Sequence, residues 1–433
     1  MAVPDARDTA LRLLLDREGR GRFIEQRFDT SPAFRALTPQ DRGLTQELVY
    51  GVMRQQAAID WVIRFKTDDR IPPPEVLEIL RLGLYQILWL DRIPPHAAVN
   101  ESVRLAREWG FDRQSGFINA ILRAAVREMA PLKQQLERLK QHEPSTGYSH
   151  PEWLVERWQA RYGAANTIKL LDWNNRPAPI YARVNTIKTT TAKLTEAWSR
   201  EGVEFRPLSR DWIPDGLVFE LVNPPSLNGL ASFTSGQFYV QDPSTLLSVQ
   251  MLQPKAGQRI LDFCAAPGGK CTYIAQCVDN RSEIIAHDVD HVRLDFIREN
   301  ATRLGTDSIR IVPPTDSPTI LGDFDAVLLD APCSNSGVLR RRVELRWRLL
   351  PGEMKRLTAD QLVLIRQVAA TVRPGGCLVY STCSLEPEEN SGLIQAFLKY
   401  EPRFSLEAER QLTPIQDGVD GAYAARLRRT AKV

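Results

Sequence analysis

One nine-residue segment, 262–270, constrains the fold of this chain more than any other feature. It reads Asp-Phe-Cys-Ala-Ala-Pro-Gly-Gly-Lys, follows an apolar run at 259–261 and precedes a helix-like stretch at 272–278. A strand, a turn of small residues and a helix together present a ligand site beyond the strand ends of an open α/β sheet. Gly268 and Gly269 let the backbone approach a ligand closely, because neither carries a Cβ atom. The segment lacks both G-x-G-x-x-G and the G-K-[ST] ending of a P-loop, which argues against NAD and ATP.

From Phe238 onward the chain alternates between strand-like and helix-like patterns. Nearly continuous apolar strands with helices between them predict a doubly wound, mostly parallel sheet, because such a sheet is buried on both faces. We therefore expect an α/β domain over 236–433. Its predicted strands are 259–263, 284–288, 309–312, 325–330, 377–381, 403–406 and 422–427, and its predicted helices are 272–278, 291–304, 353–371 and 388–400.

Residues 1–145 predict an all-α helical domain. Thr38 suits the cap of a helix that has Pro39 at its first position, and apolar residues recur beyond it at helical spacing. The segment 143–151 is rich in Pro, Ser, Thr and Gly and is typical of a linker. Mixed helix and strand patterns then indicate a small α+β domain over 151–235.

Length and composition agree with a multidomain globular protein, since 433 residues exceed one ordinary core and 25% are charged. No apolar run approaches the roughly 18 residues of a membrane span, and the first residues lack a signal peptide's apolar core. We therefore expect a cytoplasmic protein. The six cysteines include no Cys-x-x-Cys pair, which argues against zinc. A net charge of +3 is too small to indicate a nucleic-acid binder, so any basic surface must be local.

Three aspartates, Asp288, Asp316 and Asp330, come at the ends of successive predicted strands. Strand ends are where an open sheet binds its ligand. A carboxylate at Asp288 can accept hydrogen bonds from both ribose hydroxyls of a nucleotide-like ligand. A single strand-end aspartate is commonly a helix cap, but three in register with a Gly-Gly turn indicate a binding site.

Two cysteines, Cys333 and Cys383, follow neighbouring predicted strands, within Pro-Cys-Ser and Thr-Cys-Ser. Because strand ends face the ligand crevice in this fold, these thiols are candidates for chemistry. Most free cysteines are instead small buried hydrophobes. We expect that role for Cys271, Cys277 and Cys377.

The segments 262–270, 330–334 and 381–384 together resemble the NOL/NOP/Sun family of RNA cytosine-C5 methyltransferases. The strings at 83–88 and 116–123 resemble the NusB-type RNA-binding domain of one bacterial branch, which acts on 16S ribosomal RNA. The resemblance spans nearly the whole chain. It implies a Rossmann-like methyltransferase domain, S-adenosyl-L-methionine as cofactor and small-subunit ribosomal RNA as partner. We expect a monomer with no metal and no membrane partner.

The resemblance also implies how the chemistry is divided. Carbon 5 of cytosine is a poor nucleophile, so a thiolate must first add to carbon 6. The resemblance assigns this attack to Cys383 and a part in product release to Cys333. Asp330 can hydrogen-bond the ring and stabilise negative charge that develops on it. Lys270 either holds the carboxylate end of the loop or lowers a thiol pKa through its charge.

The chain departs from the family pattern at two places. Asp316 stands within Pro-Pro-Thr-Asp-Ser, where the family usually has a Gly-Asp setting, and 342–344 reads Arg-Val-Glu in place of the usual His-Pro-Asp. The implied cofactor-binding residues are Cys264, Ala265, Ala266, Pro267, Gly268, Gly269, Lys270, Asp288, Arg293, Asp316 and Asp330.

Two groups of residues are candidates for binding RNA. Arg183 and Asn185 belong to an Arg-Val-Asn string that resembles the start of the family's RNA-recognition-like subdomain. The second group is an arginine run at 340–348 that contains Trp347, as a site for a phosphate backbone and an unstacked base would. Its candidate RNA ligands are Arg340, Arg341 and Arg346. An arginine run is also typical of a solvated surface.

Two other functions fit the same patterns. A transfer-RNA cytosine-C5 methyltransferase would share the fold and both cysteines. An RNA-binding assembly or antitermination factor would keep the helical domain beside a vestigial methyltransferase domain. The intact loop, the strand-end acids and the two cysteines argue against the second alternative, and binding of S-adenosylmethionine would exclude it.

Overall fold

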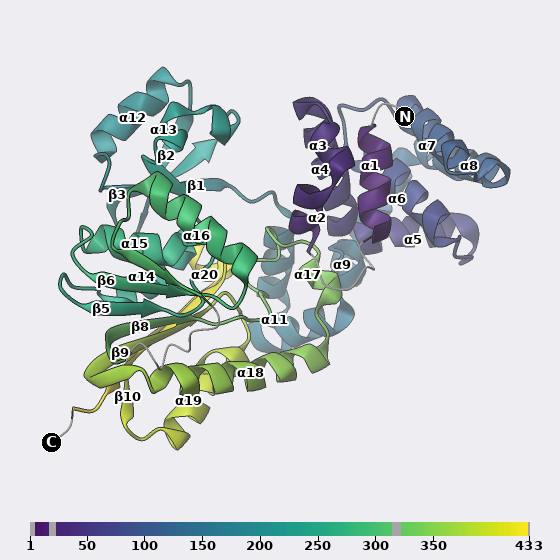
Figure 1. The fold of residues 1–433 in the computed structure, drawn as a ribbon. Coiled ribbons are helices and arrows are strands. Elements are labelled where there is room, and N and C mark those ends of the chain that lie inside the picture. The colour runs from purple at the N-terminus through teal and green to yellow at the C-terminus, as the bar shows by residue number, and fades with distance from the viewer. Residues whose placement is uncertain (1–4, 17–22, 314–321, 432–433) are drawn as a thin grey trace. The chain divides into compact units, whose positions relative to one another are not determined.

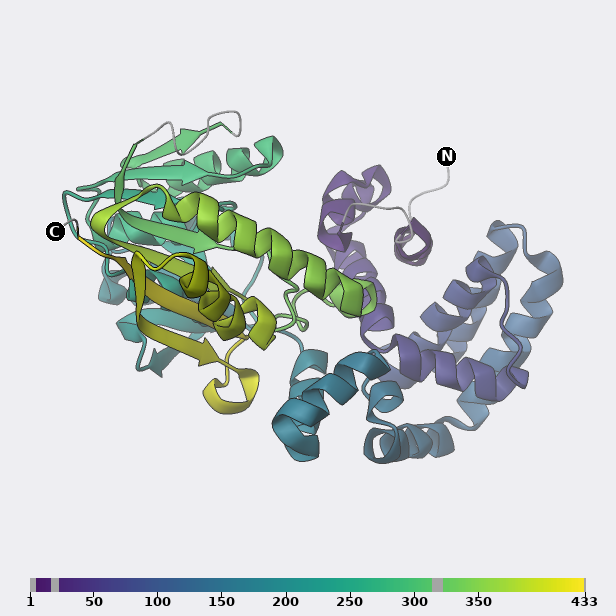
Figure 2. The same cartoon turned by 90° about the horizontal axis from the view of Figure 1, so that it is seen from below.

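The computed structural model describes residues 5–16, 23–313 and 322–431. The chain divides into two compact units (Figures 1 and 2). The first unit comprises Met1–Arg176 and Arg342–Arg348, and the second comprises Pro177–Arg341 and Leu349–Val433. A short insertion from the second half of the sequence thus belongs to the first unit, which no sequence pattern predicts.

The first unit is helical with its own apolar core, as predicted. Thr38 caps α4 (Pro39–Arg54), and its hydroxyl accepts a hydrogen bond from the Asp41 amide at 3.2 Å. Helix α11 (Glu152–Asn175) lies within the predicted 151–235 domain and falls in this unit by its contacts. The other helices are α1 (Ala6–Leu15), α2 (Ile24–Thr30), α3 (Pro32–Ala36), α5 (Gln56–Thr67), α6 (Pro74–Trp89), α7 (Pro95–Glu108), α8 (Asp112–Arg127), α9 (Met129–His142), α10 (Pro144–Gly147) and α17 (Leu345–Arg348).

The second unit begins with a four-stranded antiparallel sheet in the order β2-β3-β1-β4. Strand β1 (Ile180–Val184) lies where the alternating pattern predicts it. No sequence pattern predicts β2 (Glu204–Arg210), because its side chains are largely exposed and lack apolar alternation. The remaining elements are β3 (Ile213–Val222), β4 (Phe238–Val240), α12 (Thr191–Arg200) and α13 (Ala231–Thr234).

A seven-stranded sheet follows, in the order β10-β11-β9-β8-β5-β6-β7. Five neighbouring strands, β9, β8, β5, β6 and β7, are parallel. The last two strands of the chain, β10 and β11, are added at one edge by antiparallel pairing. This confirms the predicted doubly wound sheet. The strands are β5 (Arg259–Asp262), β6 (Glu283–His287), β7 (Ile309–Val312), β8 (Phe324–Asp330), β9 (Val372–Thr382), β10 (Phe404–Leu412) and β11 (Ala422–Arg429).

Alternate strand residues face opposite sides of this sheet. Ile260 packs in one apolar cluster with α14 (Leu246–Leu252), α15 (Gly269–Cys277) and α16 (His291–Leu304), whereas its neighbour Leu261 packs in another with α18 (Pro351–Ala369) and α19 (Ser391–Tyr400). Figure 1 shows these two helix layers on opposite faces. Burial on both faces fixes the register, because a one-residue slip would exchange the two clusters. Within the described ranges, no helix is both long and apolar enough to cross a membrane.

Candidate active site

The segment 263–268 forms a tight turn between β5 and α15, as predicted. The Gly268 amide donates a hydrogen bond to the Ala265 carbonyl at 2.8 Å, and the Ala265 amide donates to the His287 carbonyl at 2.9 Å. Gly268 has φ +106°, a conformation that side chains disfavour, so glycine is required there. At Gly269, a Cβ atom would lie 3.1 Å from the Tyr239 ring. The glycines therefore allow the tight path of this turn beyond the end of β5.

Asp288 follows β6 and faces this turn. Its carboxylate, 2% exposed, accepts hydrogen bonds from the Ala266 amide at 3.1 Å and the Asp290 amide at 3.2 Å. Arg293 on α16 donates to the Ala266 carbonyl at 2.7 Å, with its guanidinium 3.6 Å from Asp288. Both residues thus hold the turn. A carboxylate accepts about four hydrogen bonds, so Asp288 keeps capacity for a ligand.

Lys270 and Asp330 form an ion pair at the floor of the site, with Nζ 2.6 Å from Oδ2. Ser381 donates a hydrogen bond to the other Asp330 oxygen at 2.8 Å. Burial lowers the pKa of Lys270, but the neighbouring Asp330 and Asp262 carboxylates outweigh it and raise the pKa overall. Lys270 is therefore a cation that orients Asp330.

Asp262, the last residue of β5, lies close enough to Lys270 and Asp330 to interact with both charges, and the sequence did not single it out as a ligand. It is 0% exposed, and no described residue gives either oxygen a hydrogen bond of normal geometry. Burial raises its pKa to about 7, although Lys270 opposes the shift. Its position at the strand end is the signal that marks it.

Cys333 and Cys383 come together beyond the ends of β8 and β9, as predicted from their strand-end positions. Their Sγ atoms lie 3.4 Å apart, and the Cys383 thiol donates a hydrogen bond to Asn335 Oδ1 at 3.1 Å. Cys333 is buried, whereas Cys383 is partly exposed. The hydrogen bond with Cys383, together with burial, raises the pKa of Cys333. Cys383 is thus the more accessible thiol.

A buried glutamate that no motif singled out holds both cysteine loops. Glu389 is 0% exposed and accepts hydrogen bonds from the Ser334 amide at 2.8 Å and the Gln361 amide group at 3.0 Å. The hydroxyls of Ser334 and Ser384 also donate to it. Each serine directly follows one of the two cysteines. The acidic run Pro-Glu-Glu-Asn at 387–390 was the available signal, because a charged residue so close to an apolar strand needs partners.

The structure corrects the proposed RNA contacts of the arginine cluster. Arg340 is 4% exposed and pairs with Asp420, and Arg341 pairs with Asp420 at 2.6 Å and with Asp242 at 2.8 Å. Both guanidinium groups therefore form ion pairs with carboxylates of the second unit. Buried charges require such partners, which makes a phosphate contact at Arg340 unavailable.

Arg346 belongs to the first unit and is 0% exposed. It donates hydrogen bonds to the Asn175 side chain at 2.7 Å and to the Asn174 carbonyl at 2.9 Å. Burial lowers its pKa to about 9. The neighbouring Trp347 donates to the Met53 carbonyl at 2.8 Å. The departure from the family at 342–344 thus lies in a segment whose side chains form hydrogen bonds with helices of the first unit, not in an exposed RNA loop.

Arg183 and Asn185 are buried as well, each 1% exposed. Arg183 donates to the Gly269 carbonyl at 2.8 Å and to the Thr272 hydroxyl at 3.2 Å, between the rings of two tyrosines. Asn185 donates to the Gly236 and Leu304 carbonyls, both at 2.8 Å. These residues join β1 to the start of α15, just after the 263–268 turn, and to α16, and neither side chain is exposed where RNA could contact it.

The remaining residues that the sequence singled out are one aspartate and four cysteines. Asp316 lies outside the described residues. Cys264 in the turn is half-buried, and burial raises its pKa. Cys271 and Cys377 are buried as expected, but Cys277 is exposed because it lies at the solvent side of α15. Among the described residues, no group of three or more His, Cys, Asp or Glu side chains has the arrangement of a metal site.

Three family models match the chain. Residues 4–127 match the NusB family, residues 150–224 match the ferredoxin-like domain of RsmF/B-like methyltransferases, and residues 249–428 match the family described as 16S rRNA methyltransferase RsmB/F. The matches follow the order of the helical region, the small sheet and the large sheet.

Curated relatives and solved structures agree with these matches. The "probable ribosomal RNA small subunit methyltransferase B" of Bacillus subtilis is 32% identical over 99% of this chain and 100% of its own length. The ribosomal RNA small subunit methyltransferase B of Yersinia pseudotuberculosis is 33% identical, covering 93% of this chain and 96% of the relative. The crystal structure of NSun6 from Pyrococcus horikoshii with SFG has a TM-score of 0.58 at 25% identity, covering 65% of this chain and 99% of that one.

Proposed function

Because the chain belongs to the RsmB/F family of 16S rRNA methyltransferases, we propose that it methylates carbon 5 of a cytosine in 16S ribosomal RNA, with S-adenosylmethionine as methyl donor. The observation that carries the proposal is the pair of thiols, Cys333 and Cys383, beside the Lys270–Asp330 ion pair. This arrangement offers a nucleophile and a hydrogen-bonding carboxylate at one strand edge. Methyl transfer to an oxygen or an exocyclic nitrogen needs no thiol.

The cofactor turn suits S-adenosylmethionine in three respects. The glycines leave room for close approach, Asp288 keeps capacity for ribose hydroxyls, and Asp262 is a buried carboxylate without a strong partner near the Lys270–Asp330 pair. The solved relative with SFG supports a cofactor of this type. When bound, S-adenosylmethionine supplies an electrophilic methyl group. We assign its binding to 264–270, Asp288, Arg293, Asp330 and Asp316.

The proposed reaction follows from the residues around the thiols. The Cys383 thiol, which is partly exposed, first loses its proton to solvent. The thiolate then forms a bond to carbon 6, and the electron pair of the carbon 5–carbon 6 double bond makes carbon 5 nucleophilic. Asp330, oriented by Lys270 and Ser381, accepts a hydrogen bond from the exocyclic amine of cytosine and so orients the base, and the Lys270 cation beside it offsets the negative charge that develops on the ring. After methylation, solvent water takes the proton from carbon 5. The electron pair of that C–H bond re-forms the double bond to carbon 6, and the carbon 6–sulfur bond breaks to release the Cys383 thiolate. We assign Cys333 to this release step.

The direct test is methylation of unmodified 16S RNA with a labelled methyl donor, followed by mapping of the labelled nucleotide. We expect label in 5-methylcytosine, and none with a Cys383→Ala variant. Unmodified transfer RNA is the matched alternative substrate. Label in another base would contradict the proposal, and preferential labelling of transfer RNA would change its substrate.

A further inference from the structure

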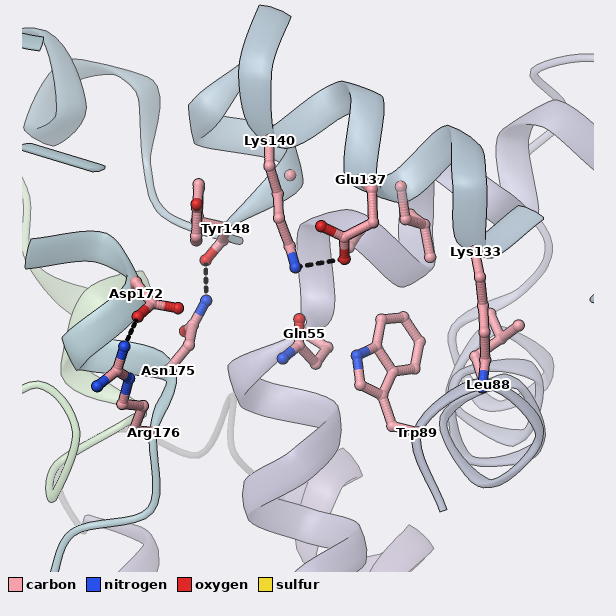
Figure 3. Close-up of a pocket in the computed structure, with 13 residues that line it drawn as sticks. Gln55, Leu88, Trp89, Lys133, Glu137, Lys140, Tyr148, Asp172, Asn175 and Arg176 are labelled. Carbon is pink, nitrogen blue, oxygen red and sulfur yellow. Dashed lines mark hydrogen bonds and ion pairs between the residues drawn. The ribbon is translucent and has the colours of Figure 1, made fainter. Parts of the chain in front are cut away.

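The helical unit contains a pocket of about 380 Å³ that has no part in the proposed methyl transfer (Figure 3). Gln55 lies between α4 and α5, Trp89 ends α6, and Lys133 and Lys140 project from α9. All of its lining residues belong to the first unit. Its size falls within the roughly 300–1,000 Å³ typical of ligand pockets.

Two side chains in the pocket keep unused hydrogen-bonding groups. Among the described residues, neither the Gln55 amide nor the Trp89 indole N–H has a hydrogen-bond partner, although both side chains are half-buried. Figure 3 shows them side by side beneath α9. An amide offers both a donor and an acceptor, and an indole offers a flat apolar surface with one donor. Together they match the edge and the face of a nucleic-acid base.

The cationic side chains differ in how strongly they are already paired. Lys140 lies 2.6 Å from Glu137, and Arg176 pairs with Asp172, so each lining acid has its own partner. Lys133 lies 3.9 Å from Asp91, and both of these side chains are largely exposed, so that pair is weak. Three lining cations face two lining anions. The pocket therefore favours an anionic ligand that Lys133 and Lys140 can reach.

We propose that this pocket binds one unpaired nucleotide of the substrate RNA. The base lies against Trp89 with its edge toward Gln55, and the phosphate lies near Lys133 and Lys140. RNA-binding proteins commonly recognise single-stranded nucleotides by aromatic stacking and hydrogen bonds to the base edge. The inference rests on the proposed function for the presence of RNA, but none of these residues takes part in the chemistry.

The test is RNA binding by full-length variants, measured with a 16S RNA fragment that the wild-type protein methylates. Trp89→Ala should weaken binding at least about fivefold, since one stacked base contributes roughly 1–3 kcal/mol. Trp89→Phe should retain most of the affinity because it keeps an aromatic face. Gln55→Ala should weaken binding for RNAs with an unpaired base and leave fully paired RNA unaffected.

Lys133→Gln combined with Lys140→Gln should reduce the steepness of log affinity against log salt by about 0.7, because the two lysines together contact one single-strand phosphate. Lys169→Gln is the matched control, because Lys169 is an exposed lysine of the same unit that does not line the pocket. If Trp89→Ala unfolds, the lysine and glutamine variants still decide the question.

Unchanged RNA affinity and salt slope in the Gln55 and lysine variants would overturn the pocket proposal, while wild-type methylation of RNA would leave the proposed function standing. If the Gln55 and lysine variants instead kept their RNA affinity but lost binding to a small-subunit ribosomal protein, the pocket would have a protein occupant and the nucleotide proposal would be overturned. Failure of the wild-type protein to methylate any RNA would contradict the proposed function itself. Cofactor affinity should be the same in all of these variants.

Discussion

The sulfur atoms of Cys333 and Cys383 lie 3.4 Å apart, although 50 residues separate them in the chain. Parallel pairing of β8 with β9 brings them together, because Asp330 is in register with Ser381 and each cysteine follows its strand by a few residues. Two thiols at this distance can act on the same base, which makes their separate roles testable.

We expect Cys383→Ala to be inactive and to form no covalent RNA adduct, because the neighbouring thiol, Cys333, is buried. Cys333→Ala should form the adduct but release it slowly, so a covalent complex should accumulate. Denaturing gel electrophoresis with labelled RNA reports the adduct as a slow band that ribonuclease removes. A slow band from Cys383→Ala and none from Cys333→Ala would reverse the assignment.

Asp288→Ala should weaken S-adenosylmethionine binding about tenfold or more, because a hydrogen bond to a charged group contributes about 1.5–3 kcal/mol. The turn also loses its contact to the Ala266 amide. Isothermal titration calorimetry measures the dissociation constant. Asp295→Asn, at an exposed position on α16, is the control and should leave the dissociation constant unchanged. An unchanged constant in Asp288→Ala would remove this residue from the site.

Glu389→Gln should lower kcat at least about tenfold with little change in cofactor affinity, because Glu389 positions the loops of both cysteines without touching the cofactor turn. The glutamine side chain lacks the negative charge of Glu389. Its NH2 group can only donate, so it cannot accept the hydrogen bonds that the serine hydroxyls donate to Glu389. Single-turnover methylation together with adduct yield separates the steps. Glu389→Asp should recover part of the rate if positioning is the role. Equal losses in cofactor affinity and rate would indicate general unfolding.

Arg340→Gln should destabilise the second unit by about 3 kcal/mol, because removal of one partner leaves a buried charge only partly compensated. Burial already raises the pKa of Asp420 to about 6, with Asp242 adding to the shift. Thermal unfolding measures the effect, and Arg298→Gln on the surface is the control. A flatter salt dependence of RNA binding, with unchanged stability, would restore the phosphate-binding role.

Asp262 should make the protein less stable as pH rises from about 4 toward 7. Its folded pKa of about 7 lies above the unfolded value of about 3.9, so between these values the folded state keeps a proton that the unfolded state has released. The stability contribution is therefore complete below about pH 4, falls through this window and levels off above about pH 7. Asp262→Asn, which stays neutral, should therefore gain stability relative to wild type between pH 5 and pH 8. Urea unfolding at both pH values measures this. A parallel pH dependence in the two proteins would contradict the raised pKa.

Local patterns in the sequence determined the order of elements and the positions of the strand ends. Apolar runs and turn residues marked β5 to β9, and the cofactor turn and both cysteines followed from their places after strands. These features depend on residues close in sequence. The same reasoning missed β2, because an exposed strand without apolar alternation leaves little local signal.

Only the tertiary structure decided which charged residues are accessible. Arg183, Arg340 and Arg346 look like RNA ligands in the sequence, yet each is buried against a partner 58 to 197 positions away. A buried guanidinium and an exposed one have the same local sequence, since what differs is the distant carboxylate or carbonyl that replaces water. For the same reason only the fold shows how the two buried carboxylates differ. Asp262 has no hydrogen-bond partner among the described residues, whereas Glu389 accepts several hydrogen bonds.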